Sequence, residues 1–108
     1  MIVSTVGYVP GYELVEILGI VMGNTVRAKH IGRDIAAGLK TLVGGEIAGY
    51  TEMLSESRNI AYERMIKNAE DMGADAIIGM KFSTSSIMQN TAEMLAYGTA
   101  VKLKKIEK

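Results

Sequence analysis

The feature that most constrains the fold is a helical block at residues 30–73, flanked on both sides by sequence that favours strands. The block predicts two helices separated at Gly44-Gly45, because glycine readily ends a helix. Every strand in the rest of the chain must then be covered by this block or by another copy of the chain. With 108 residues, the chain is expected to form a single domain, 1–108.

The two helices differ in length. The shorter is expected at about residues 31–43 and the longer at about residues 48–72. A helix of about 24 residues is roughly 36 Å long, enough to cross a whole sheet in a domain of this size. One face of the longer helix repeats at helical spacing and consists of Tyr50, Met53, Leu54, Ser57, Ala61, Met65, Ala69 and Met72.

Strands are expected at residues 2–5, 12–29, 74–86 and 94–104, with a hairpin loop at residues 87–93. The longest of them, 12–29, is mostly apolar on both faces, which a half-exposed antiparallel strand would not be. Within it, Gly19 and Gly23 indicate bulges or positions where another backbone comes close.

The last strand has one small face and one bulky face. The small face, formed by Ala96, Gly98 and Ala100, suits close packing of a helix. The bulky face consists of Leu95, Tyr97, Thr99, Val101 and Leu103. No element of the monomer remains to cover the bulky face, and this predicts self-association.

Composition excludes several classes of protein. The 12 basic and 12 acidic residues cancel, whereas a nucleic-acid-binding protein normally has a basic excess. The C-terminal Lys102, Lys104, Lys105 and Lys108 are interpreted as a solvated strand end. The absence of cysteine excludes disulfides and thiolate chemistry. Neither a transmembrane run nor a signal peptide is recognisable, so a soluble, cytoplasmic protein without membrane partners is expected.

Two groups at the start of the shorter helix are the candidate site residues. His30 and Asp34 have i,i+4 spacing and could hold a divalent metal with ligands from elsewhere, such as a neighbouring subunit. The alternative is a histidine at the helix entry with an acidic first turn that favours the helix dipole. Lys29, Arg33 and Asp34 form a charged cluster that suits either a small anion or, preferably, ion pairs between subunits.

No catalytic arrangement can be assembled from the sequence, and the protein is expected not to be an enzyme. Gly44-Gly45 follows a helix and does not form a phosphate-binding loop. Ser83, Ser85 and Ser86 have no general base near them in the sequence. The methionines of the longer helix are interpreted as core side chains.

The whole chain resembles the YbjQ-like family. The matching stretches are Pro10-Gly11-Tyr12-Glu13, Leu18-Gly19-Ile20-Val21, Arg33-Asp34, Ala37-Gly38-Leu39, Val43-Gly44-Gly45-Glu46, Gly49-Tyr50-Thr51-Glu52, Gly73-Ala74-Asp75-Ala76 and Gly98-Thr99-Ala100-Val101. The resemblance implies a dodecin-subunit-like β-α-β-β domain of the α+β class. It also implies an antiparallel sheet covered by the short and the long helix, assembled as a pentameric ring.

The family's label, heavy-metal binding, carries no ligand residues that can be transferred to this chain. The chain has no cysteine, and His30 stands at a position not associated with histidine in the family. The resulting prediction is an uncharacterised, non-enzymatic homo-oligomer, a pentamer. The alternative is a protein that binds a metal or small ligand at subunit interfaces.

Overall fold

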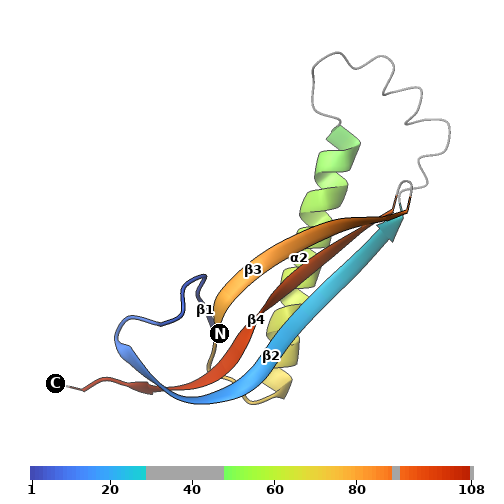
Figure 1. The fold of residues 1–108 in the computed structure, drawn as a ribbon. Coiled ribbons are helices and arrows are strands. Elements are labelled where there is room, and N and C mark those ends of the chain that lie inside the picture. The colour runs from blue at the N-terminus through green and yellow to red at the C-terminus, as the bar shows by residue number, and fades with distance from the viewer. Residues whose placement is uncertain (29–47, 89–90, 108) are drawn as a thin grey trace.

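The computed structural model describes residues 1–28, 48–88 and 91–107 as a sheet with one long helix against it (Figure 1). The described strands are β1 (Ile2–Val3), β2 (Tyr12–Ala28), β3 (Ala76–Met88) and β4 (Thr91–Lys105), and the helix is α2 (Ala48–Asp71). The predicted longer helix and the predicted strand at residues 12–29 are therefore confirmed nearly to the residue. The predicted shorter helix at residues 31–43 and the break at Gly44-Gly45 lie outside the described residues.

The sheet has the strand order β1-β3-β4-β2. Strand β4 lies between β2 and β3 and is antiparallel to both, as predicted. Strand β1, however, pairs in parallel with β3, so Ile2 lies beside Ala76 and Val3 beside Ile77. The prediction of a purely antiparallel sheet is therefore wrong, and the sheet is mixed. A parallel pair requires a long crossover, and here that crossover contains β2 and α2.

Strand β2 sets the long dimension of the molecule. Its 17 residues, at about 3.3 Å each, account for most of the 61 Å length. The register against β4 shifts between Leu14 and Glu16 and again between Ile17 and Gly19. Gly19 has a φ of 137°, a conformation that side-chain-bearing residues rarely adopt. The predicted bulge at Gly19 is thus confirmed.

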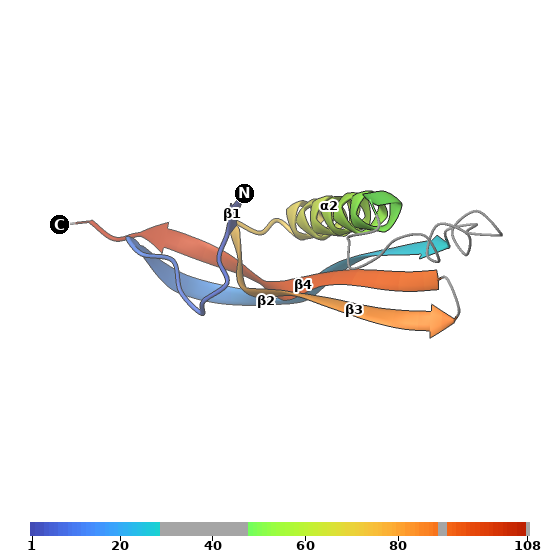
Figure 2. The same cartoon turned by 90° about the horizontal axis from the view of Figure 1, so that it is seen from above.

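The helix lies along one face of the sheet, over β2 and β4 (Figure 2). The helix comes very close to the sheet at Gly23, where a Cβ atom would overlap the backbone nitrogen of Met65 and the carbonyl oxygen of Ala61. Only a residue without a side chain allows this contact. The prediction that another backbone comes close to Gly23 is confirmed.

The main core lies between this face and the helix. On the helix, Ala61, Met65 and Ala69 are fully buried, and on β4 the predicted small residues Ala96 and Ala100 are buried beneath them. The remaining buried members of the core are Val21, Ile77 and Met80. Two members of the predicted apolar helix face, Leu54 and Met72, stay exposed, and Met72 lies just beyond the end of α2.

The hairpin between β3 and β4 is tighter than predicted. Met88 pairs with Thr91, so both strands extend into the stretch 87–93 that was expected to be a loop. Glu93 pairs with Ser85 on one side and with Val26 on the other. Polar residues are tolerated here because β3 is exposed from Lys81 to Ser86, and polarity in this stretch was mistaken for a loop.

Candidate self-association surface

On the sheet face opposite α2, strands β2 and β4 carry exposed or partly exposed apolar side chains, whereas β3 contributes the exposed polar residues Lys81, Ser83 and Ser85. Strand β2 alternates, so Val21 and Gly23 are buried beneath the helix whereas Ile20, Met22 and Val26 point away from it. Their exposed fractions are 71%, 51% and 53%. We define the outer face as Ile17, Ile20, Met22 and Val26 of β2 with Leu95, Tyr97 and Thr99 of β4.

Strand β4 completes the outer face. Tyr97 lies opposite Met22, and Thr99 lies opposite Ile20, so each pair of side chains shares a face of the sheet. Tyr97 and Thr99 are only partly buried. The exposed apolar side chains are interrupted by Asn24, whose amide donates to Glu93 over 3.3 Å, and the group is a candidate interaction surface.

One end of the same face is covered by the chain itself. Val9 is buried and packs with Ala76, Ile78 and Val101. The prediction that the monomer has no element to cover the bulky side of the last strand is therefore wrong for Val101. It was missed because the stretch before Pro10 looks like a connection, and nothing in its sequence shows where it packs. The rest of the outer face is left without such cover by the described residues.

The covering stretch, residues 4–9, is held to β3 by backbone hydrogen bonds, and we call it the N-terminal segment. The Ser4 N–H donates to the Ile77 carbonyl over 2.8 Å, and the Met80 N–H donates to the Ser4 carbonyl over 3.0 Å. The Gly79 N–H donates to the Val6 carbonyl over 2.9 Å. These bonds fix the segment beside the first half of β3.

The free edge of the sheet, along β2, is partly capped by the helix. The Asn68 side-chain amide donates to the Met22 carbonyl over 2.7 Å. One turn earlier, Arg64 Nη1 donates to the Asn24 carbonyl over 2.8 Å. Both carbonyls therefore have partners and are less available to a strand added from outside.

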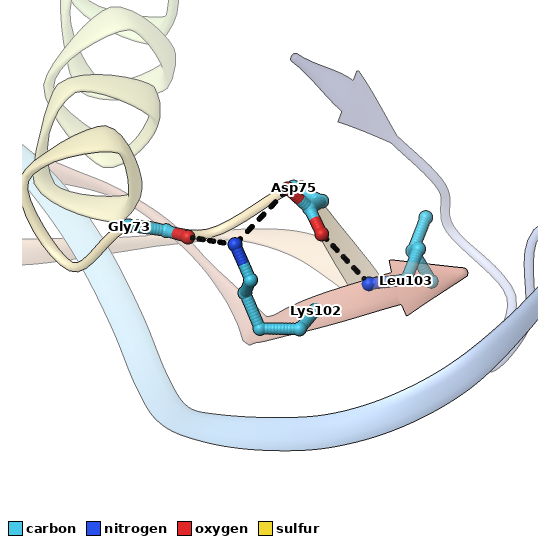
Figure 3. Close-up of polar contacts among 4 residues, drawn as sticks. All are labelled: Gly73, Asp75, Lys102 and Leu103. Atoms are coloured by element: carbon cyan, nitrogen blue, oxygen red, sulfur yellow. Dashed lines mark hydrogen bonds and ion pairs between the residues drawn. The ribbon is translucent and has the colours of Figure 1, made fainter.

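A polar cluster ties the end of the helix to β4 (Figure 3). The Lys102 ammonium donates to the Gly73 carbonyl over 3.0 Å and to Asp75 over 3.3 Å, while the Leu103 N–H donates to Asp75 over 2.8 Å. The bond from Leu103, with a smaller contribution from Lys102, lowers the pKa of Asp75 despite some desolvation. Lys102 is thus not simply part of a solvated strand end, although Lys104 and Lys105 are exposed as predicted.

The sequence-predicted site residues Lys29, His30, Arg33 and Asp34 all lie outside the described residues. Within residues 1–28, 48–88 and 91–107, no three His, Asp or Glu side chains come together in a way that could hold a metal ion. In the same part, no helix is long and apolar enough to cross a membrane.

These features define a class of protein: an α+β domain in which, among the described residues, one sheet face packs on a helix and the other is mostly uncovered. The chain belongs to the YbjQ family, whose model, described as "Putative heavy-metal-binding", matches residues 1–104. It is 66% identical over 106 residues to a UPF0145 protein of Thermotoga petrophila, covering 98% of this chain and all of that one. It is 60% identical over 105 residues to a UPF0145 protein of Colwellia psychrerythraea, covering 97% of this chain and all of that one.

The fold has a solved relative. A crystal structure of a protein of unknown function of the DUF74 family, from Pediococcus pentosaceus, superposes with a TM-score of 0.65. The match covers 96% of this chain and 98% of that chain at 21% identity. The likeness supports the α+β fold of the chain.

Proposed function

We propose that this protein is a non-enzymatic homo-oligomer, assembled as a pentameric ring. The observation that carries the proposal is the outer face, where Ile17, Ile20, Met22 and Val26 are all more than half exposed. Covering each of them would contribute roughly 1–2 kcal/mol. The non-enzymatic role is supported by the sequence, in which no combination of nucleophile, base and orienting group can be recognised.

Light scattering on the purified protein tests the assembly. The expected mass is five times the 11.6 kDa of one chain and stays constant on dilution through the micromolar range. A mass of one chain at every concentration would contradict self-association. A constant mass of two or six chains would retain self-association and reject the pentamer.

The alternative is a protein that binds a metal or small ligand at subunit interfaces, which the description of the matching family model favours. Within the chain, His30 and Asp34 supply a nitrogen and a carboxylate donor at i,i+4 spacing, and a second copy would supply the remaining ligands. Calorimetric titration with Zn²⁺, Ni²⁺ and Cu²⁺ tests this.

Stoichiometric binding that is lost in both His30→Ala and Asp34→Ala would support the alternative and its site. Binding that survives both substitutions would reject these two residues as ligands. No binding of any of the three ions would reject the alternative for these metals.

A further inference from the structure

We propose that Arg64 and Asn68 of α2 block strand addition at the free edge of β2, and that the strand they exclude is the β3 edge of a second copy. The blocked edge is separate from the outer face, and the block does not depend on how many copies assemble through that face. It explains why two helix side chains that are not part of the core reach the backbone of β2.

The free edge of β2 is the side of the strand that faces away from β4. Strand β2 is the last strand in the order of the described sheet, and β4 is its neighbour there. Backbone groups of alternate residues point to the same side of a strand, so the carbonyls of Met22 and Asn24 belong to one edge. Such an edge presents a row of backbone N–H and C=O groups, which is a template for pairing with another chain.

The two blocking side chains lie on the flank of α2 that faces this edge. On the opposite flank, Tyr62 contacts Phe82 of β3, with 6.3 Å between the ring centroids. Arg64 and Asn68 are exposed and project toward β2. Their spacing matches that of the strand, because four helix residues rise about 6 Å and two strand residues about 6.6 Å. Each side chain therefore reaches one carbonyl, over 2.8 Å from Arg64 and 2.7 Å from Asn68.

The two blocked carbonyls lie in the part of β2 that another strand could use most easily. In the first part of β2, register shifts occur at Leu14–Glu16 and at Ile17–Gly19, and bulges of this kind discourage strand addition. From residue 19 to residue 28 the register is continuous. Met22 and Asn24 are in the middle of this regular part, so a strand added there would lose its two central hydrogen bonds.

A second copy offers a strand that could pair with β2. The backbone bonds from β3 to the N-terminal segment end at Met80, and no described strand lies beside residues 81–85 on that side of β3. This β3 edge and the β2 edge are different surfaces of the same chain. Pairing between them would therefore repeat from copy to copy. Blocking one of the two edges is sufficient to prevent it, and the helix blocks β2.

A double variant, Arg64→Ala with Asn68→Ala, tests the proposal. Both side chains are exposed, so the subunit is expected to keep its fold, as circular dichroism will verify. The probe is a fluorescent peptide with the sequence of residues 81–88, and its binding is followed by fluorescence anisotropy. Because two hydrogen bonds to the edge become available, the double variant should bind the peptide roughly thirtyfold more tightly than the native protein. In light scattering, its mass should rise above that of the native protein as the concentration increases.

Two controls separate strand pairing from other effects. Glu63→Ala with Lys67→Ala removes two exposed side chains from the same turns of α2, on the side away from the sheet, and should leave peptide binding and mass unchanged. The peptide carrying Ser83→Pro and Ser85→Pro has lost two backbone donors and should not bind the double variant. Asn68→Ala alone frees one carbonyl and should strengthen binding of the unmodified peptide by roughly fivefold.

Equal peptide affinity in the native protein and the double variant would overturn the proposal, as would equally strengthened binding in the Glu63 and Lys67 control. Binding of the proline-containing peptide would show that side chains, not backbone pairing, hold the probe, and would overturn it too. If the double variant does not fold, the folded Asn68→Ala variant decides the matter, because an unchanged affinity there contradicts the block. None of these outcomes depends on whether the native protein is a pentamer.

Discussion

The two faces of this sheet come from the same strands but are built in opposite ways. Beneath the helix, β2 and β4 present Gly23, Ala96 and Ala100, which let the helix backbone come very close. On the outer face the alternate positions, Ile20 and Met22, are large and exposed. Small residues allow a tight contact within one chain, whereas large exposed apolar residues contribute to stability only if another surface covers them.

The contrast shows how one strand can serve two purposes. Because side chains alternate from face to face, β2 carries a subunit core and an exposed apolar row in the same 17 residues. A shift of one residue in the pairing register of β2 would move its core side chains to the outer face and its outer side chains to the helix-covered face. The bulges at Leu14–Glu16 and Ile17–Gly19 lie before the stretch that faces the helix, and from Gly19 to Ala28 the register is continuous.

The largest expected effect is that of Gly23→Ala on the helix-covered face. The added Cβ would meet backbone atoms of Met65 and Ala61, neither of which can move without displacing α2. We expect the free energy of unfolding, measured in urea, to fall by about 3 kcal/mol or more. Gly7→Ala, with open space around it, is the control and should change it by about 0.5 kcal/mol or less. Equal decreases in the free energy of unfolding for Gly23→Ala and Gly7→Ala would refute the close contact between Gly23 and the helix backbone.

Methionine truncation compares the two faces directly. Met65→Ala removes a fully buried side chain and is expected to lower the free energy of unfolding by about 2–5 kcal/mol. Met22→Ala, on the outer face, should lower it by about 1 kcal/mol or less at low protein concentration, where copies are apart. The same Met22→Ala variant should dissociate at higher concentration than the native protein. A similar loss of subunit stability in both variants would show that the faces are equivalent.

Removing a buried hydroxyl from the helix-covered face is expected to have a smaller effect, and to raise the free energy of unfolding instead of lowering it. Thr25 Oγ1 and Ser57 Oγ are buried without a hydrogen-bond partner among the described residues. Thr25→Val keeps the shape and removes the unpaired group, so it should raise the free energy of unfolding by up to about 1 kcal/mol. Val26→Thr, on the outer face, should change it by about 0.5 kcal/mol or less. Destabilisation by Thr25→Val would indicate that a buried water satisfies the hydroxyl.

The smallest expected effect on stability is that of Asp75→Asn, in the polar cluster that joins the end of α2 to β4. The pKa of Asp75 lies below its ordinary value of 3.8, so the carboxylate is stabilised in the folded state. This contribution is present above pH 3.8 and is lost as the pH falls through the folded pKa. Asp75→Asn should therefore weaken the acid dependence of stability. Asp71→Asn, which breaks only an exposed ion pair with Lys67, should change that dependence less, and the opposite order would contradict the assignment.

Much of the fold is predictable from the sequence because it depends on local patterns. Glycine and small-residue positions identified the helix contact at Gly23 and at Ala96, and helical periodicity located α2. The parallel pairing of β1 was missed because two residues carry no periodicity, and only the partner strand decides the direction of pairing. The cover of Val101 by Val9 was missed because packing between distant segments leaves no local signal.

The candidate self-association surface was also predicted from the sequence only in part. The bulky face of the last strand was predicted from side-chain alternation, and the structure confirms its position opposite α2 at Tyr97 and Thr99. The N-terminal segment beside this face was not foreseen, because its position depends on bonds to β3 that the sequence does not reveal. The charged cluster at Lys29, Arg33 and Asp34 stays a prediction, since it lies outside the described residues.

The pairing of β2 with β4 also dictates the order of events during synthesis. The first residue of β2, Tyr12, pairs with the last residue of β4, Lys105, so the sheet cannot close until the end of β4 has left the ribosome. The hairpin of β3 and β4 is local and can form quickly, whereas β2 must wait with its apolar side chains unpaired. The nascent chain is therefore most vulnerable to aggregation through β2 in the interval before β4 emerges.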